Sequence, residues 1–218
     1  MSDKIRILVV DDHALVRGTV AECLAAEPGF HIAGTAASAD EAIQQAVECQ
    51  PDVILMDIDM PGLICFDAAT TIESTNPKAR IVFLSSFLHD WYIERALEVG
   101  ARGYLTKREP PEAVIAAVRT VAGGGICFSE EVRSRLTLDA NGARLTRTSR
   151  SRASTLTARE MEVLRYIAKG LSKKEIATTM HLSVKTIDRH CFNLMTKLDI
   201  HDRVELARYA IREGLMNA

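Results

Sequence analysis

Carboxylate, hydroxyl and ammonium side chains occur in this chain at the ends of short apolar runs. Five of them follow four of these runs: Asp11, Asp12, Asp57, Ser85 and Lys107. Carboxylate oxygens are the ligands that Mg²⁺ prefers, and one carboxylate can also act as a nucleophile. A carboxylate attacking phosphate brings negative charges together, so a metal ion and an ammonium group are needed beside it. These residue types therefore indicate phosphoryl chemistry, provided that the fold brings them together.

The apolar runs alternate with segments of helical periodicity. The predicted strands cover residues 4–10, 31–36, 53–56, 81–84 and 103–105. The predicted helices begin near Ala14, cover 39–48, follow the third strand, and cover 91–99 and 111–121. This alternation predicts a doubly wound, five-stranded parallel sheet, whose ligands bind at the carboxyl ends of the strands. The five residues should therefore converge.

Each of these residues has a simpler interpretation when it is taken singly. Asp11 and Asp12 would cap the following helix, Asp57 and Ser85 would be turn residues, and Lys107 would be a solvated surface lysine. Their occurrence at four separate strand ends favours one common site.

A different pattern begins after Gly123-Gly124-Gly125. Residues 125–154 are predicted to form a linker with a possible short helix near 129–136, because polar residues dominate and apolar periodicity is absent. From Thr157 onward, three helix-start signals occur, of which Thr157 with Glu160 and Ser172 with Glu175 are capping boxes. With a third start at Ser183 and a last helix near 204–213, the chain is predicted to end in a small all-α domain of four helices.

Charge and composition limit the classes of function. Residues 1–124 carry 10 basic and 18 acidic side chains, whereas residues 155–218 carry 11 and 8, so an acidic front precedes a basic end. A basic segment fits a nucleic-acid partner, because phosphate neutralisation dominates such binding. With 47% hydrophobic and 26% charged residues, the chain is not expected to be disordered. No apolar run approaches the length of a membrane span and no signal peptide is evident, so we expect a cytoplasmic protein without membrane association.

The first 124 residues resemble the receiver domain of two-component response regulators, which has a flavodoxin-like fold. The resemblance is carried by four motifs in matching order and spacing: Val-Val-Asp11-Asp12-His13, Leu-Met-Asp57-Ile-Asp-Met60-Pro61-Gly62, Leu84-Ser85-Ser86 and Gly103-Tyr104-Leu105-Thr106-Lys107. One departure is Cys65, which stands where the family usually has a second glycine and is expected to be a partly exposed thiol.

The resemblance implies a role for each residue of these motifs. Asp57 would be the phospho-acceptor, while Ser85 and Lys107 would contact the phosphoryl group. Tyr104 would be the switch aromatic that rotates inward together with the movement of Ser85. The ligands of Mg²⁺ (or Mn²⁺) would be the side chains of Asp12 and Asp57 and the backbone carbonyl of Asp59, with Asp11 in support.

Residues 155–218 contain the motifs of the LuxR-type helix-turn-helix domain, and the chain as a whole resembles the NarL/FixJ response regulators. The motifs are Leu156-Thr157-Ala-Arg-Glu160, Gly170-Leu-Ser172-Lys-Lys174-Glu175-Ile176-Ala177 and Leu182-Ser183-Val184-Lys185-Thr186-Ile187-Asp-Arg189-His190. The third helix would enter the major groove of double-stranded DNA. The expected DNA-contacting residues are Lys173, Lys174, Lys185, Thr186, Arg189, His190, Asn193 and Lys197.

These features predict a transcription regulator, not an enzyme, that a sensor histidine kinase or a small phosphodonor activates at Asp57 and that dimerises on DNA. One alternative is an aspartyl-phosphate phosphohydrolase, because Asp57-Ile58-Asp59 superficially resembles the DxD motif of that family. In the hydrolases that motif follows the first strand and has Thr or Val at its fifth position, whereas here it lies at the third strand and Pro61 occupies the fifth position. Another alternative is a DNA-binding adaptor that does not use phosphate.

Overall fold

The computed structural model describes residues 4–61, 64–139, 142–146 and 152–215. The chain divides into two compact units, one formed by residues 1–86 and 93–144 and the other by residues 87–92 and 145–218. Gly62 and Leu63, within and next to one receiver motif, lie outside the described residues, as does part of the predicted linker. Within the described part of the chain, no helix is long and apolar enough to span a membrane.

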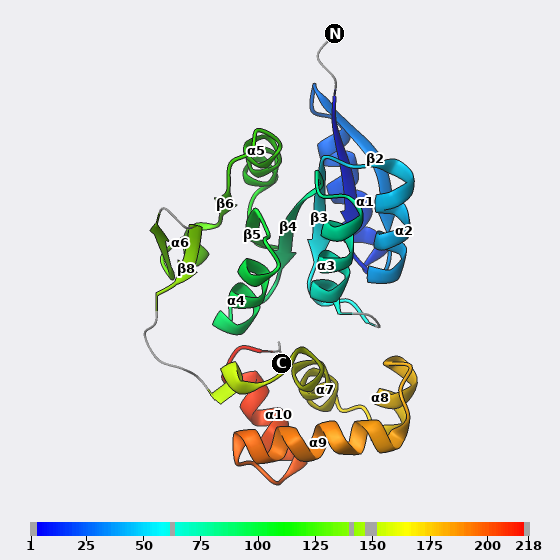
Figure 1. Ribbon diagram of the computed structural model, residues 1–218, viewed down its shortest axis with the longest axis vertical. Coiled ribbons are helices and arrows are strands. Elements are labelled where there is room, and N and C mark those ends of the chain that lie inside the picture. The colour runs from blue at the N-terminus through cyan, green and yellow to red at the C-terminus, as the bar shows by residue number, and fades with distance from the viewer. Residues whose placement is uncertain (1–3, 62–63, 140–141, 147–151, 216–218) are drawn as a thin grey trace. The chain divides into compact units, whose positions relative to one another are not determined.

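The first unit contains a parallel sheet of six strands in the order β2-β1-β3-β4-β5-β6 (Figure 1). The strands are β1 (Ile5–Val10), β2 (Phe30–Ala36), β3 (Val53–Asp57), β4 (Arg80–Ser85), β5 (Gly103–Thr106) and β6 (Cys127–Phe128). The first five confirm the predicted strands and the doubly wound fold. The sixth, a two-residue strand paired with β5, was not predicted.

Helices cover both faces of this sheet because its central strands are apolar on both sides. They are α1 (Ala14–Ala25), α2 (Ala39–Cys49), α3 (Cys65–Thr75), α4 (Asp90–Glu98) and α5 (Pro111–Ala122). Leu24 of α1 and Val118 of α5 pack with Val9 and Leu55 in one core cluster. On the other face Phe66 of α3 packs against Phe83 of β4, with ring centroids 5.2 Å apart.

The segment predicted as a linker contains more structure than its composition suggested. The expected short helix is present as α6 (Glu130–Arg133), and a two-stranded sheet follows, formed by β7 (Leu136–Asp139) and β8 (Gly142–Leu145). With four residues each, these strands are too short for alternation of apolar and polar positions to distinguish them from a loop, so the sequence did not reveal them.

The second unit contains four α-helices that begin at or next to the predicted positions. After a short 3₁₀ turn, η1 (Arg152–Thr155), come α7 (Ala158–Ala168), α8 (Lys173–Thr179), α9 (Val184–Leu198) and α10 (Arg203–Arg212) (Figure 1). Both capping boxes are present, and the Ser183 side chain accepts a hydrogen bond from the Thr186 N–H. Gly170, at φ 83°, makes the turn between α7 and α8, a conformation that glycine adopts without steric cost.

Candidate functional site

Three of the predicted site residues meet at the carboxyl ends of β1, β3 and β5. Asp11 follows β1, Asp57 ends β3, and both carboxylates are buried. Lys107, which follows β5, places its Nζ 2.7 Å from Asp11 Oδ2 and 2.8 Å from Asp57 Oδ2. Parallel strands that end together account for this convergence, because Asp57 is in register with Leu84 of β4. A single ammonium group therefore bridges two buried carboxylates.

Asp12 and His13 lie next to these carboxylates, directly before α1. His13 Nδ1 lies 2.8 Å from Asp12 Oδ1, and the His13 backbone N–H donates to Asp11 Oδ1. The residue at the N-cap of α1 is His13, and its side chain makes no capping hydrogen bond. Asp11 thus braces the loop before the helix, and neither acid is the N-cap residue that the simpler interpretation required. His13 had no predicted role, although it follows the two acids directly in the motif.

Burial and charge pairing have opposite effects on the pKa values of Asp57 and Lys107. Burial raises the pKa of Asp57 above its usual value, and the nearby Lys107 ammonium only partly offsets this effect. Burial by itself would lower the pKa of Lys107, but Asp57 and Asp11 outweigh it and raise that pKa. The lysine therefore remains charged and favours the ionised form of the Asp57 carboxylate.

Ser85 ends β4, Tyr104 lies within the neighbouring strand β5, and both are fully buried. The Ser85 carbonyl accepts a hydrogen bond from the Lys107 N–H at 2.9 Å, which fixes the start of the loop that carries the lysine. Burial raises the pKa of the Tyr104 hydroxyl, and a side-chain hydrogen bond with Ser85 opposes that rise. The two residues expected to form a switch are thus in direct contact.

Two further residues lie on the loop and helix that follow β3. The Asp59 backbone N–H donates to Asp57 Oδ1 at 3.2 Å, so this loop orients the carboxylate. Cys65 is the first residue of α3 and is buried, 3% exposed. The expectation of a partly exposed thiol is therefore wrong, because the helix begins at this residue and turns the side chain into the core.

The donor set fits a hard divalent cation. Ligand atoms from Asp11, Asp12, His13 and Asp57 all lie within 4.8 Å of one another. Among the described residues, Asp12 Oδ1 and Asp57 Oδ2 are buried oxygens that accept no hydrogen bond of good geometry, although each has a cationic or imidazole nitrogen nearby. Such oxygens retain lone pairs for a metal ion, and carboxylates suit Mg²⁺ or Mn²⁺ better than softer metals.

In the second unit, α9 has one apolar and one polar side. Ile187, Cys191, Leu194 and Leu198 recur at helical spacing and are buried. Lys185 and Arg189 are exposed on the opposite side, while Thr186, His190 and Asn193 are half-buried along one flank. Lys174 is exposed on α8. The predicted DNA-contacting residues on α9 are thus all outside its buried apolar stripe.

Two of the predicted phosphate contacts are already engaged in ion pairs. Lys173 Nζ of α8 lies 2.6 Å from Asp188 Oδ1 of α9, and both side chains are about half exposed. Lys197 Nζ of α9 lies 2.6 Å from Glu160 Oε2 of α7, a carboxylate that is 3% exposed. The second pair packs α9 against α7. Neither partner could be predicted from local sequence, since both pairs connect different helices.

The surroundings of the half-buried His190 favour the neutral form of its imidazole. Burial lowers the pKa of its imidazole, and the positive charges of Arg159 and Arg189 lower it further against the opposing effect of Glu160. As a neutral ring it offers one hydrogen-bond donor and one acceptor, not a cation.

The sequence matches two known families. Residues 7–119 match the response regulator receiver domain, and residues 154–210 match the bacterial regulatory proteins of the luxR family. Among characterised relatives, the response regulator protein VraR of Staphylococcus aureus is 35% identical over 216 residues, which cover 97% of this chain and 99% of VraR.

Solved structures agree with both parts of the fold. The RcsB response regulator of Salmonella typhimurium superposes with a TM-score of 0.72 at 21% identity, covering 97% of this chain and 99% of RcsB. A LuxR-family two-component response regulator from Aurantimonas sp. SI85-9A1 gives a TM-score of 0.58 at 30% identity, covering 61% of this chain and 94% of that protein.

Proposed function

Because the chain belongs to the two-component response regulators with a LuxR-type DNA-binding domain, we propose that it is a transcription regulator switched by phosphorylation of Asp57. The donor is a sensor histidine kinase or a small phosphodonor, which places the protein in the cytoplasm. The observation that carries this proposal is the position of Lys107 Nζ, 2.8 Å from the buried Asp57 carboxylate.

In the proposed transfer, a carboxylate oxygen of Asp57 forms a bond to phosphorus. The phosphorus–nitrogen bond of the donor phosphohistidine breaks, and its electron pair remains on the imidazole. Lys107 and the Ser85 hydroxyl contact the oxygens of the transferred group, while the Asp59 N–H holds Asp57 Oδ1. Preorganised donors of this kind stabilise charge on a phosphoryl group without reorganising during the reaction.

We assign the divalent-cation site to the side chains of Asp12 and Asp57 and the backbone carbonyl of Asp59, supported by Asp11. When bound, Mg²⁺ or Mn²⁺ reduces the repulsion between the phosphoryl group and these acids. His13 shares Asp12 Oδ1 and therefore competes for one ligand atom.

The switch in this proposal couples the pocket to DNA binding. Ser85 moves toward the phosphoryl group, and Tyr104, its hydrogen-bond partner, repacks the surface around β5 and α4. A two-state equilibrium biased by one phosphoryl group then favours dimerisation and an exposed recognition helix. RcsB has been solved bound to promoter DNA in the presence of a phosphomimetic, a combination that we propose for this chain as well.

We assign DNA recognition to α9 in the major groove of double-stranded DNA. Lys185, Thr186 and Arg189 lie toward its N-terminal half, where recognition helices contact base edges. The remaining contacts, proposed to be mainly with the backbone, are His190, Asn193, Lys173, Lys174 and Lys197. Because Lys173 and Lys197 are ion-paired within the domain, their contribution to phosphate binding is the weakest of this set.

The experiment is the incorporation of one phosphoryl group from a small phosphodonor, followed by intact-mass measurement with and without Mg²⁺. We expect one group in the parent protein, none in Asp57→Asn, and little without the cation. Asp59→Asn is the matched control, since Asp59 is assigned only backbone contacts, and it should still accept phosphate. Phosphorylation that persists in Asp57→Asn would refute the assignment, and continuous turnover of the donor would favour a hydrolase.

A further inference from the structure

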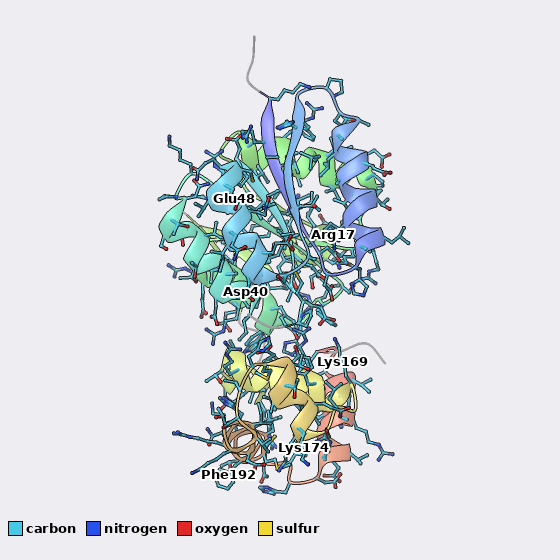
Figure 2. All side chains as sticks on the ribbon, turned by 90° about the vertical axis from the view of Figure 1, so that its right-hand side faces the viewer. Arg17, Asp40, Glu48, Lys169, Lys174 and Phe192 are labelled. Atoms are coloured by element: carbon cyan, nitrogen blue, oxygen red, sulfur yellow. The ribbon has the colours of Figure 1, made fainter. Side chains whose placement is uncertain are left out.

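Phe192 stands out on α9 because its aromatic ring is exposed to solvent. It is 69% exposed, whereas the other aromatic residues between 152 and 215, Tyr166 and Tyr209, are buried. Figure 2 labels it at the outer edge of the helical unit. An exposed phenyl ring contributes little to folding, so it is available for contact with a partner.

Two neighbours of Phe192 on its face of the helix are residues assigned to DNA. At 3.6 residues per turn, positions three, four and seven residues apart share one face of a helix. Arg189 precedes Phe192 by three residues, Lys185 by seven, and Thr196 follows by four, and all three are exposed. This face lies opposite the buried stripe of Ile187 and Leu194. Phe192 is therefore central to the face that α9 would direct into the groove.

We propose that the Phe192 ring reads thymine in the major groove by packing against the 5-methyl group of the base. Thymine is the one base with a methyl group at the major-groove edge, and apolar side chains, including phenylalanine, recognise it by contact. This inference rests on the proposed DNA-binding function and adds a contact with thymine to those assigned to the polar residues of α9.

Charge complementarity favours DNA over a protein as the occupant of this face. Two cations, Lys185 and Arg189, lie on the same face of the helix as the ring, and lysine is depleted from protein interfaces. The other exposed apolar residue of α9, Val184, lies eight residues before Phe192 with the charged Asp188 between them, so the two side chains do not form a continuous apolar patch. A lone ring that shares a helix face with two cations fits a polyanion that also offers an apolar group, as the major groove does at thymine.

The test removes the methyl group from the DNA instead of relying on the protein variant alone. Binding sites are first selected from random duplex DNA with the full chain in the presence of a phosphoryl mimic and Mg²⁺. Each thymine is then replaced singly by deoxyuridine, which lacks only the 5-methyl group. Affinities are measured for the parent protein, Phe192→Ala, Phe192→Leu and Val204→Ala, the last being a control at an exposed apolar residue of α10.

We expect at least one thymine in each half-site whose replacement weakens binding by the parent protein about fourfold, the value for one buried methyl group. Phe192→Ala should bind thymine and deoxyuridine sites equally, Phe192→Leu should keep part of the preference, and Val204→Ala should keep all of it. Because Phe192 is exposed, these variants should unfold at the temperature of the parent protein.

Each contrary result has a distinct meaning. If the parent protein binds DNA but no thymine methyl matters, or if Phe192→Ala retains the preference, the thymine inference is wrong while the proposed function stands. If Phe192→Ala instead lowers the oligomeric mass, the ring contacts a second copy of the chain and the inference is again overturned. If the parent protein selects no DNA, the proposed function itself fails.

Discussion

Lys197 of α9 donates a hydrogen bond of 2.6 Å to the nearly buried carboxylate of Glu160, the residue that also closes the capping box of α7. One acid thereby caps the first helix of the domain and fixes the C-terminal part of the proposed recognition helix. A cation on the DNA-binding helix is thus part of the domain's internal structure, and this distinguishes it from Lys185 on the exposed face.

This pairing predicts that two lysines of the same helix respond differently to substitution. Lys197→Met leaves a buried carboxylate without its partner, so the free energy of unfolding should fall by about 1–3 kcal/mol. Lys185→Met should leave stability unchanged and weaken DNA binding. Urea denaturation and DNA titration measure the two effects, and equal stability of the two variants would contradict a structural role for Lys197.

Glu160 should make the stability of the protein depend on pH in the acidic range. Burial by itself would raise its pKa, but the hydrogen bonds from Lys197 and Thr157 outweigh burial and hold the pKa below its usual value of 4.5. A lowered pKa means that the ionised acid stabilises the fold above pH 4.5 and that this contribution is lost as the pH falls through the folded-state pKa.

Unfolding measured between pH 7 and pH 3 should therefore show a steeper loss of stability in the parent protein than in Glu160→Gln. Glu175→Gln is a matched control, since Glu175 has the same place in the capping box of α8 but is exposed to solvent. Identical pH profiles for the parent protein and Glu160→Gln would refute the assignment.

The Lys173–Asp188 pair should limit affinity for DNA more than it stabilises the domain. Both side chains are half exposed, and such pairs contribute less than about 1 kcal/mol to stability. Asp188→Asn removes a negative charge from the proposed interface and releases Lys173 for a phosphate, so affinity should rise and its dependence on salt should steepen by about one unit of slope.

Asp199→Asn is the control for this effect. It removes the same charge at the C-terminal end of α9, where the residue adopts a left-handed conformation that asparagine tolerates. Its salt dependence should stay close to that of the parent protein. A steeper slope in Asp199→Asn alone, or none in Asp188→Asn, would contradict the proposed orientation of α9.

Asp12 and His13 give a prediction about the cation site. Asp12→Asn should weaken Mg²⁺ binding at least tenfold, because one carboxylate ligand is lost from a site with few charged ligands. His13→Ala should leave binding equal or tighter, since the imidazole no longer occupies Asp12 Oδ1. Calorimetric titration with Mg²⁺ measures the affinity of both variants. Tighter binding in Asp12→Asn would exclude this carboxylate from the site.

Local sequence was sufficient for most of the fold and for the residues of the pocket. The apolar run of β1 ends where Asp11 begins, and the box of Thr157 with Glu160 determines the start of α7, so both features depend only on neighbouring residues. Strand order then brings Asp11, Asp57 and Lys107 together, because parallel strands align their carboxyl ends.

The features that the sequence did not reveal depend on distant residues or on weak patterns. Lys197 and Glu160 are 37 residues apart, and only the packing of α9 on α7 brings them together. The strands β6, β7 and β8 are too short for alternation to be recognised. The exposure of Phe192 could be predicted from the sequence, because this aromatic residue lies opposite the apolar stripe of the helix. The basic residues beside it were, however, the stronger indication of DNA binding.

The most direct test of the central claim is the affinity for selected DNA and the oligomeric mass, measured with and without a phosphoryl mimic plus Mg²⁺. If Asp57 is the switch, the mimic should tighten DNA binding and promote dimerisation in the parent protein and in Asp59→Asn, and it should have no effect in Asp57→Asn. DNA binding that is indifferent to the mimic and to Asp57 would contradict the account, leaving a DNA-binding protein without a phosphorylation switch.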